Sequence, residues 1–229
     1  MKMPPIPRVR PTYLAAIVAL AIGGAAFAGT SAAHTHPATA HKHGGSAALN
    51  VRQAAFHDGM RKLWEDHVTW TRLAIVSFAG DLPDLPATET RLLQNQTDIG
   101  NAIEPYYGRA VGNRLTGLLR EHILGAVALL QAAKADDEAR ITAASNAWYA
   151  NGNQLADFLN AANPRGWSRS TTRSMMKEHL DQTLKEAQDR LTGKFAADVR
   201  DYDAVHSHIL EMADTLSAGI MRQFPQRFR

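Results

Sequence analysis

Three short stretches of the sequence each place a histidine directly after an acidic residue. In each, two apolar residues and a charged residue come first, and an apolar residue follows the histidine. They are LWEDHV (63–68), LLREHI (118–123) and MMKEHL (175–180). The histidines are His67, His122 and His179, and the spacing between them is nearly constant. Neutral imidazole is the commonest side-chain metal ligand, so these residues are candidate ligands for a borderline metal ion such as Zn, Cu(II) or Ni.

The acid before each histidine has a different expected position. Successive residues of a helix are rotated by about 100°, so an acid next to a buried histidine lies at the edge of the apolar stripe or at the surface. A carboxylate there could orient an imidazole by accepting its N–H. These acids are Asp66, Glu121 and Glu178.

A fourth candidate histidine lies in the stretch DYDAVHSHILEMAD near the C-terminus. Asp203 and His206 are three residues apart and share a helical face, whereas His208 is expected to point elsewhere. A carboxylate and an imidazole at this spacing can bind one metal ion. We therefore predict a metal site formed by His67, His122, His179, His206 and Asp203. Asn95, Asn153 and His206 follow the three repeated histidines by 28, 31 and 27 residues, so the return helices align less well. They are the expected counterparts on those helices, and Asn95 and Asn153 are candidate hydrogen-bond partners of the ligands.

Two other interpretations of the histidines stay open. A histidine on an apolar face is usually a core residue that hydrogen-bonds to a neighbour. The protein would then be a structural or interaction protein whose histidines form a buried polar network. An enzyme is the third hypothesis, but no nucleophile–base pair, Gly-rich phosphate loop or His-Glu-x-x-His motif is present to support it. Non-covalent haem bound by histidine or methionine (Met175, Met176 or Met212) has no further support.

The elements that must position these residues are helices. From Leu49 onward, apolar residues recur three and four apart, and prolines fall only between such segments. Asp137 and Ser170 are expected N-caps, and Gly193 is an expected helix stop. The pattern predicts helices near residues 49–79, 87–103, 109–134, 137–162, 169–192 and 195–223.

These helices predict an all-α fold in which residues 49–229 form one domain. Short connections make consecutive helices antiparallel neighbours, so we expect an up-and-down bundle of about six helices arranged as three helical hairpins. Each hairpin pairs one acid-His helix with a return helix. The chain contains no cysteine, which excludes disulfides, thiolate metal sites and covalent haem attachment.

The N-terminal part predicts export. Arg8 and Arg10 precede an apolar run that ends in a small-x-small site at residues 26–28, which is typical of a secretory signal peptide over residues 1–28. An uncleaved membrane anchor is the alternative. Cleavage removes Lys2, Arg8 and Arg10, so 22 basic residues remain against 22 acidic ones. A neutral mature chain is not expected to bind nucleic acid or, after cleavage, a membrane.

Residues 29–48 are rich in Ala, Thr, Gly and His and lack an apolar period, which predicts a disordered linker. Alternate residues of an extended chain point to the same side, so a His-x-His pair can present two imidazoles to one metal ion. The alternative is a solvated tail without a role. One pair is His34 and His36, and the other is His41 and His43.

Four motifs spread over nearly the whole mature chain support a family resemblance. They are LWEDHVTWTR, LLQNQTDIGNAIEPYYG, LLREHI and KEHLDQT. The combination resembles a family of exported or secreted bacterial all-helical proteins of unknown function, whose members are often labelled glycosyltransferase or acetylglutamate kinase by automatic transfer. The resemblance implies export and a helical architecture, and it implies no catalytic residue.

Overall fold

The computed structural model describes residues 49–229, which form six long helices and one short 3₁₀ helix. This part of the chain contains no strand, so the all-α prediction is confirmed. The expected signal peptide and His-rich linker lie outside the described residues. The elements are α2 (Val51–Ala79), α3 (Leu85–Tyr107), α4 (Arg109–Lys134), α5 (Glu138–Ala162), α6 (Arg169–Leu191), α7 (Phe195–Gln223) and η1 (Pro225–Phe228).

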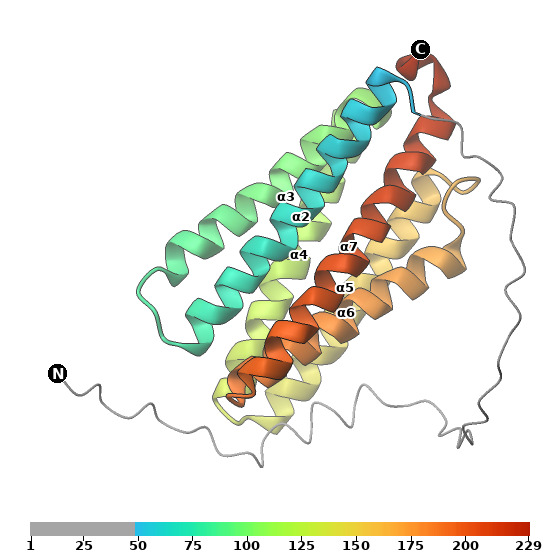
Figure 1. Ribbon diagram of the computed structural model, residues 1–229. Coiled ribbons are helices and arrows are strands. Elements are labelled where there is room, and N and C mark those ends of the chain that lie inside the picture. The colour runs from blue at the N-terminus through green and yellow to red at the C-terminus, as the bar shows by residue number, and fades with distance from the viewer. Residues whose placement is uncertain (1–48) are drawn as a thin grey trace, which may run out of the picture.

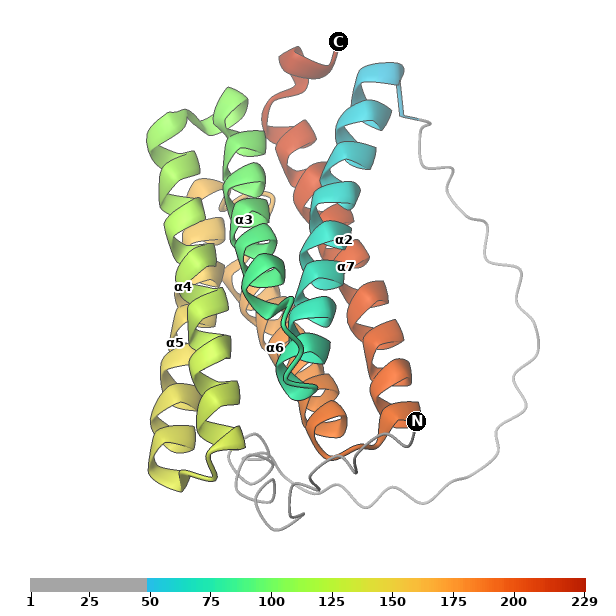
Figure 2. The same ribbon diagram turned by 90° about the vertical axis from the view of Figure 1, so that its left-hand side faces the viewer.

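The six helices form a closed ring of antiparallel neighbours (Figures 1 and 2). Each helix packs on the helix before it and the helix after it, and α7 completes the ring by packing on α2. Helices α2 and α6 also touch across the interior. Three hairpins, α2–α3, α4–α5 and α6–α7, therefore surround one core, as expected for an up-and-down bundle.

Most helix ends match the sequence signals. The side chain of Asp137 accepts a hydrogen bond from the Arg140 N–H and caps α5, and Gly193 follows α6 with a φ of +74°, which favours glycine. The expected cap at Ser170 is wrong. Ser168 has the extended backbone that an N-cap needs and accepts from the Thr171 N–H, whereas Ser170 lies inside the first turn.

The predicted second helix, residues 87–103, ends too early. Helix α3 continues through Pro105 to Tyr107 rather than stopping near residue 103. Pro105 is exposed, and there the carbonyl group that loses its N–H partner can bond to water. The chain then turns from α3 into α4 at Gly108, whose φ is +83°.

Small residues allow α3 and α4 to approach closely. A Cβ atom on Gly100 would lie 2.7 Å from the carbonyl oxygen of Gly112, so the two backbones nearly touch. Elsewhere large apolar side chains fill the interior, among them the tryptophans Trp64, Trp148 and Trp167. Burial of such side chains is the main stabilising term of the fold.

The first and last residues of the described chain lie close together. The side-chain amide of Asn50 donates to the carbonyl oxygen of Phe228 at 2.6 Å. The rings of Phe56, Tyr106 and Phe228 pack together beside this contact, with centroid distances of 5.0–5.4 Å. No helix in the described part is long and apolar enough to cross a membrane.

Candidate functional site

The bundle brings the three repeated histidines together in its interior. His67 of α2, His122 of α4 and His179 of α6 are all buried. The ring centroid of His179 lies 5.8 Å from that of His67 and 6.1 Å from that of His122. Each histidine lies on the buried face of its helix, and the three side chains meet at the same level of the bundle.

The fourth ring of the cluster comes from His208 and not from His206. The His208 ring is buried and lies 6.4 Å from the His179 ring. His206 lies partly exposed beside Glu65 at 3.0 Å, and Asp203 is exposed. Two residues rotate a helix face by about 200°, so His208 points inward and His206 outward. We call His67, His122, His179 and His208 the histidine cluster.

Each return helix makes the same contact with its acid-His helix. The donor side chain follows the hairpin's histidine at a nearly constant spacing, and the acceptor is the backbone carbonyl four residues before that histidine. Asn95 donates to Leu63 at 3.0 Å, Asn151 to Leu118 at 3.1 Å, and the Nε2 of His208 to Met175 at 3.0 Å. The expected counterpart Asn153 is exposed, so Asn151 replaces it.

The hydrogen bonds fix the tautomers of two rings. Because the amide of Asn151 donates to Leu118, its Oδ1 faces the Nδ1 of His122 at 3.2 Å and accepts the ring N–H. The Nε2 of His122 therefore carries the free lone pair. Gln96 donates to the carbonyl oxygen of Leu92 at 2.7 Å, and the same amide nitrogen lies 3.3 Å from the Nδ1 of His67. His67 is thus an acceptor at Nδ1 and carries its proton on Nε2.

His179 lies at the centre of the cluster and has the fewest polar contacts. Its Nδ1 is buried and has no hydrogen-bond partner among the described residues. Tryptophan rings cover two of the other histidines: His122 stacks on Trp148 at 5.3 Å with an interplanar angle of 22°, and Trp64 lies edge-on to His67 at 5.8 Å. The cluster therefore lies in aromatic, largely apolar surroundings.

Burial holds the rings in the neutral form. Desolvation lowers the pKa of His67 to about 3, with a further contribution from the neighbouring His122. Burial also lowers the pKa of His122 to about 4. The pKa of His179 is well below its usual value because of burial and because of the three rings around it. Neutral imidazole is the form that binds metal ions.

The acids next to the histidines lie outside the cluster. Asp66 pairs with Lys62 at 2.8 Å, Glu121 is exposed, and Glu178 accepts from Gln182 at 3.2 Å. The shortest distance from one of these acids to a ring of the histidine cluster is 3.9 Å, between the Glu178 carboxylate and the Nδ1 of His208. These carboxylates therefore lie at the edge or the surface, as their rotation from the histidines predicts.

The distances between the rings exceed those of a bound metal ion. Two imidazoles on one tetrahedral zinc ion, with Zn–N distances of about 2 Å, have ring centroids roughly 5 Å apart. The other three rings of the cluster lie 5.8–6.4 Å from the His179 ring. Accordingly, within residues 49–229 no three histidine or acidic side chains are arranged to hold a metal ion as they stand.

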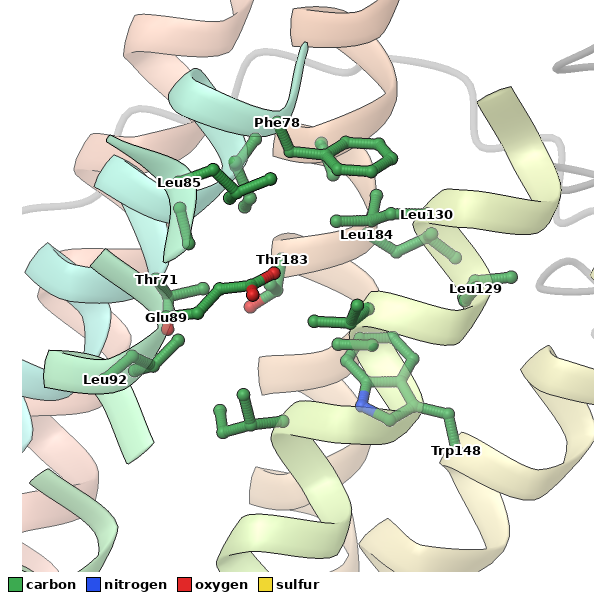
Figure 3. A pocket seen from close by; sticks show the side chains of 16 residues that line it. Thr71, Phe78, Leu85, Glu89, Leu92, Leu129, Leu130, Trp148, Thr183 and Leu184 are labelled. Carbon is green, nitrogen blue, oxygen red and sulfur yellow. The ribbon is translucent and has the colours of Figure 1, made fainter. Parts of the chain in front are cut away.

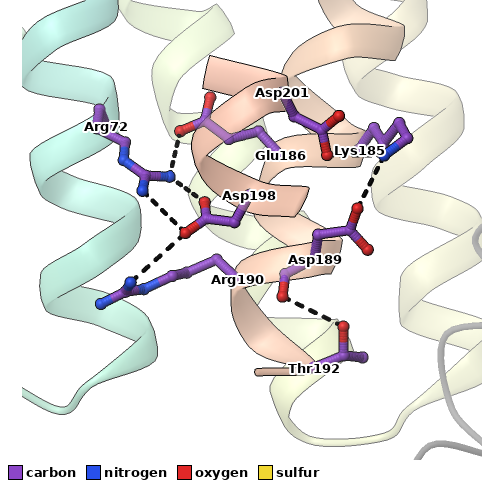
Figure 4. Close-up of polar contacts among 8 residues, drawn as sticks. All are labelled: Arg72, Lys185, Glu186, Asp189, Arg190, Thr192, Asp198 and Asp201. Carbon is purple, nitrogen blue, oxygen red and sulfur yellow. Dashed lines mark hydrogen bonds and ion pairs between the residues drawn. The ribbon is translucent and has the colours of Figure 1, made fainter. Parts of the chain in front are cut away.

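A buried charge cluster lies on the α6–α7 side, and the sequence reasoning missed it (Figure 4). We give this name to Arg72, Glu186, Arg190 and Asp198. Arg72 of α2 donates to Glu186 at 3.0 Å and to the fully buried Asp198 at 2.8 Å. Arg190 lies 3.5 Å from Asp198. Burial raises the pKa of Glu186 to about 7 against the opposing effect of Arg72.

A sequence signal for this charge cluster does exist. Glu186 follows His179 by seven residues, which is two helical turns, and so shares its buried face.

The linker candidates for metal binding cannot be placed beside either cluster. His34, His36, His41 and His43 all lie outside the described residues. No family model, curated protein or solved structure is significantly similar to this chain.

Proposed function

We propose that this protein is an exported helical bundle whose histidine cluster binds one borderline metal ion, Zn, Cu or Ni. The observation that carries the proposal is the environment of His179. Its buried Nδ1 has no partner in the described chain, and three other imidazoles surround its ring at 5.8–6.4 Å. A buried nitrogen without a partner is costly, and a metal ion would give it one.

Two further rings support metal binding. Metal-bound histidines usually donate their second ring N–H to a neighbouring oxygen, which fixes the lone pair toward the metal. His122 donates to Asn151 and His208 donates to Met175 in this way. Binding requires the three surrounding rings to move about 1 Å closer to the His179 ring, toward the ~5 Å spacing of a zinc site.

A structural role is the second candidate, because return-helix contacts already satisfy most of the cluster. Hydrogen bonds join His67 to Gln96, His122 to Asn151 and His208 to Met175. Buried polar networks of this kind fix the register of packed elements when their members are satisfied. The histidines would then set the mutual register of the three hairpins without any ligand.

Metal analysis of the untagged mature chain separates the two candidates. The linker histidines are replaced by alanine, so that only the bundle can contribute. We expect one Zn, Cu or Ni ion per chain after titration, and loss of that ion in the double variant His122→Gln, His179→Gln. The matched control is Asp203→Asn, His206→Gln, which removes exposed groups and should retain the ion. Circular dichroism checks that each variant is folded.

A protein that takes up none of the three metals refutes the metal proposal and leaves the polar network. Equal metal content in the His122/His179 variant and in the wild type would also refute it. A second comparison restores the linker histidines: extra metal in that chain measures binding by the linker alone.

Export is tested by the mass of the protein recovered outside the cytoplasm. We expect a chain that begins at Gly29, after cleavage behind Ala28. A full-length chain in the membrane fraction would indicate the uncleaved anchor instead.

A further inference from the structure

An apolar pocket lies one helical turn away from the histidine cluster. Thr71, Ala126 and Thr183, the residues four positions after His67, His122 and His179, are among the residues that line it. The α2–α3 hairpin forms one wall and helices α4 and α6 form the other. The cavity volume is about 50 Å³, several times the roughly 10–15 Å³ that a single buried water requires. The pocket therefore suits a slender ligand.

The walls of this pocket are apolar apart from three side chains. Leu, Ile, Val, Ala, Phe and Trp residues supply the other lining groups, including Phe78 and Trp148. The polar exceptions are Thr71 of α2, Glu89 of α3 and Thr183 of α6. Figure 3 shows the Glu89 side chain pointing into the pocket toward Thr183.

Each of these three side chains offers an acceptor oxygen to the pocket. The Thr71 hydroxyl already donates to the carbonyl oxygen of His67 at 2.8 Å, which leaves its lone pairs. Thr183 is 7% exposed, and its buried hydroxyl has no hydrogen-bond partner within the described chain. Glu89 lines the pocket and is partly buried.

The polar lining of the pocket favours a cationic donor. Glu89 is a partly buried carboxylate at the pocket wall, where a positive partner can form a charge-assisted hydrogen bond with it, and the Thr71 and Thr183 hydroxyls line the same pocket. A primary ammonium group carries one positive charge and three N–H donors, which matches one carboxylate and two hydroxyl acceptors. Trp148 supplies no competing donor, because its Nε1 already donates to the carbonyl oxygen of His122 at 3.1 Å.

We infer that the pocket binds a small primary amine with a slender apolar body, its ammonium group held by Glu89, Thr71 and Thr183 and its alkyl part packed against the apolar walls. A carboxylate-headed ligand of the same length is excluded by repulsion from Glu89. This site is separate from the histidine cluster, and it does not depend on metal binding there.

The test uses three probes of equal length: hexylamine, hexan-1-ol and hexanoate. Binding to the full mature chain is followed by the indole N–H resonance of Trp148, in buffer with a metal chelator so that an amine cannot bind through a metal ion. We expect hexylamine to bind at least about tenfold more tightly than hexan-1-ol, as for a charge-assisted hydrogen bond. Hexanoate should not shift the resonance.

Two variants locate the site. Glu89→Gln should weaken hexylamine at least about tenfold and leave hexan-1-ol unchanged. The matched control, Glu121→Gln, removes an exposed acid of α4 and should change neither. Ala126→Leu fills the pocket and should abolish binding of both probes. If that variant does not fold, the Trp148 shift in the wild type still locates the ligand.

Three results would overturn the inference: equal affinity for hexylamine and hexan-1-ol, unchanged hexylamine binding in Glu89→Gln, or no Trp148 shift at any millimolar concentration. Since the chelated protein carries no metal, these results say nothing about the histidine cluster, and the two proposals fail independently.

Discussion

The neutral histidines should make the fold sensitive to acid, and His122 offers the clearest test. His122→Phe keeps an aromatic ring to stack on Trp148 and removes the titrating group. At neutral pH we expect the variant to be less stable by about 1 to 3 kcal/mol, because the Oδ1 of Asn151 loses its donor.

The pH dependence of this difference follows from the His122 pKa. It is about 4 in the folded chain against an ordinary value of 6.5, so the unfolded chain binds the proton more readily. The stability that the neutral ring contributes is complete above pH 6.5 and is lost as the pH falls toward about 4. Each pH unit within this window changes the free energy of unfolding by about 1.4 kcal/mol. Between about pH 7.5 and pH 5, the wild type should therefore lose about 2 kcal/mol that the variant does not lose.

Urea unfolding at several pH values measures this difference. Other titrating groups, Glu186 among them, are common to both proteins and cancel in the comparison when they do not couple to the substitution. The matched control is His206→Gln, which removes a partly exposed histidine beside Glu65. It should follow the wild-type curve.

A constant stability difference between wild type and His122→Phe from pH 7.5 to pH 5 would contradict the reasoning. It would mean that the His122 ring accepts its proton inside the folded bundle. A cluster that opened to water, or a metal-free network with one charged imidazole, would behave in that way.

Three other predictions concern the charge cluster and one glycine. Arg72→Met should cost about 3 to 5 kcal/mol in urea unfolding, because Glu186 is left buried without its cation and Asp198 keeps only Arg190 at 3.5 Å; a loss below about 1 kcal/mol would contradict the pairing. Glu186 has a raised pKa of about 7 against 4.5, so its protonation stabilises the fold below pH 4.5, and this contribution is lost as the pH rises through about 7. Glu186→Gln should therefore flatten the pH profile between about 4.5 and 7, and an unchanged profile would refute the assignment. Gly219→Ala should destabilise the fold by about 1 to 3 kcal/mol in thermal unfolding, since its Cβ would overlap the indole of Trp167; a wild-type Tm would contradict that packing.

The helices were predictable because each has recurring apolar residues and a break at both ends. The end of α3 was not, because Pro105 usually marks a helix boundary, and only its exposed position lets the helix continue. The cap of α6 was off by two residues for a similar reason: RSTTRS offers several hydroxyl groups after Ser168, and backbone conformation decides among them.

The sequence identified the cluster residues on the acid-His helices, but it did not identify those on the return helices. His67, His122 and His179 share a visible pattern, whereas Asn151 and Asn153 are equally plausible in the sequence NGN, as are His206 and His208 in HSH. A constant spacing from each repeated histidine to its partner would have selected Asn95, Asn151 and His208. The spacings to Asn95, Asn153 and His206 are uneven, which is the sign that the expected register was wrong.

The contact between Asn50 and Phe228 has a consequence for chain order. Because α7 packs on α2 and the two ends touch at 2.6 Å, no helix of the bundle is structurally first or last. A circular permutant that joins these ends and opens the loop at residues 80–84 would begin with α3 and end with α2, and it would keep every interface of the ring. The same bundle should therefore form when the helices follow one another in a different order along the chain.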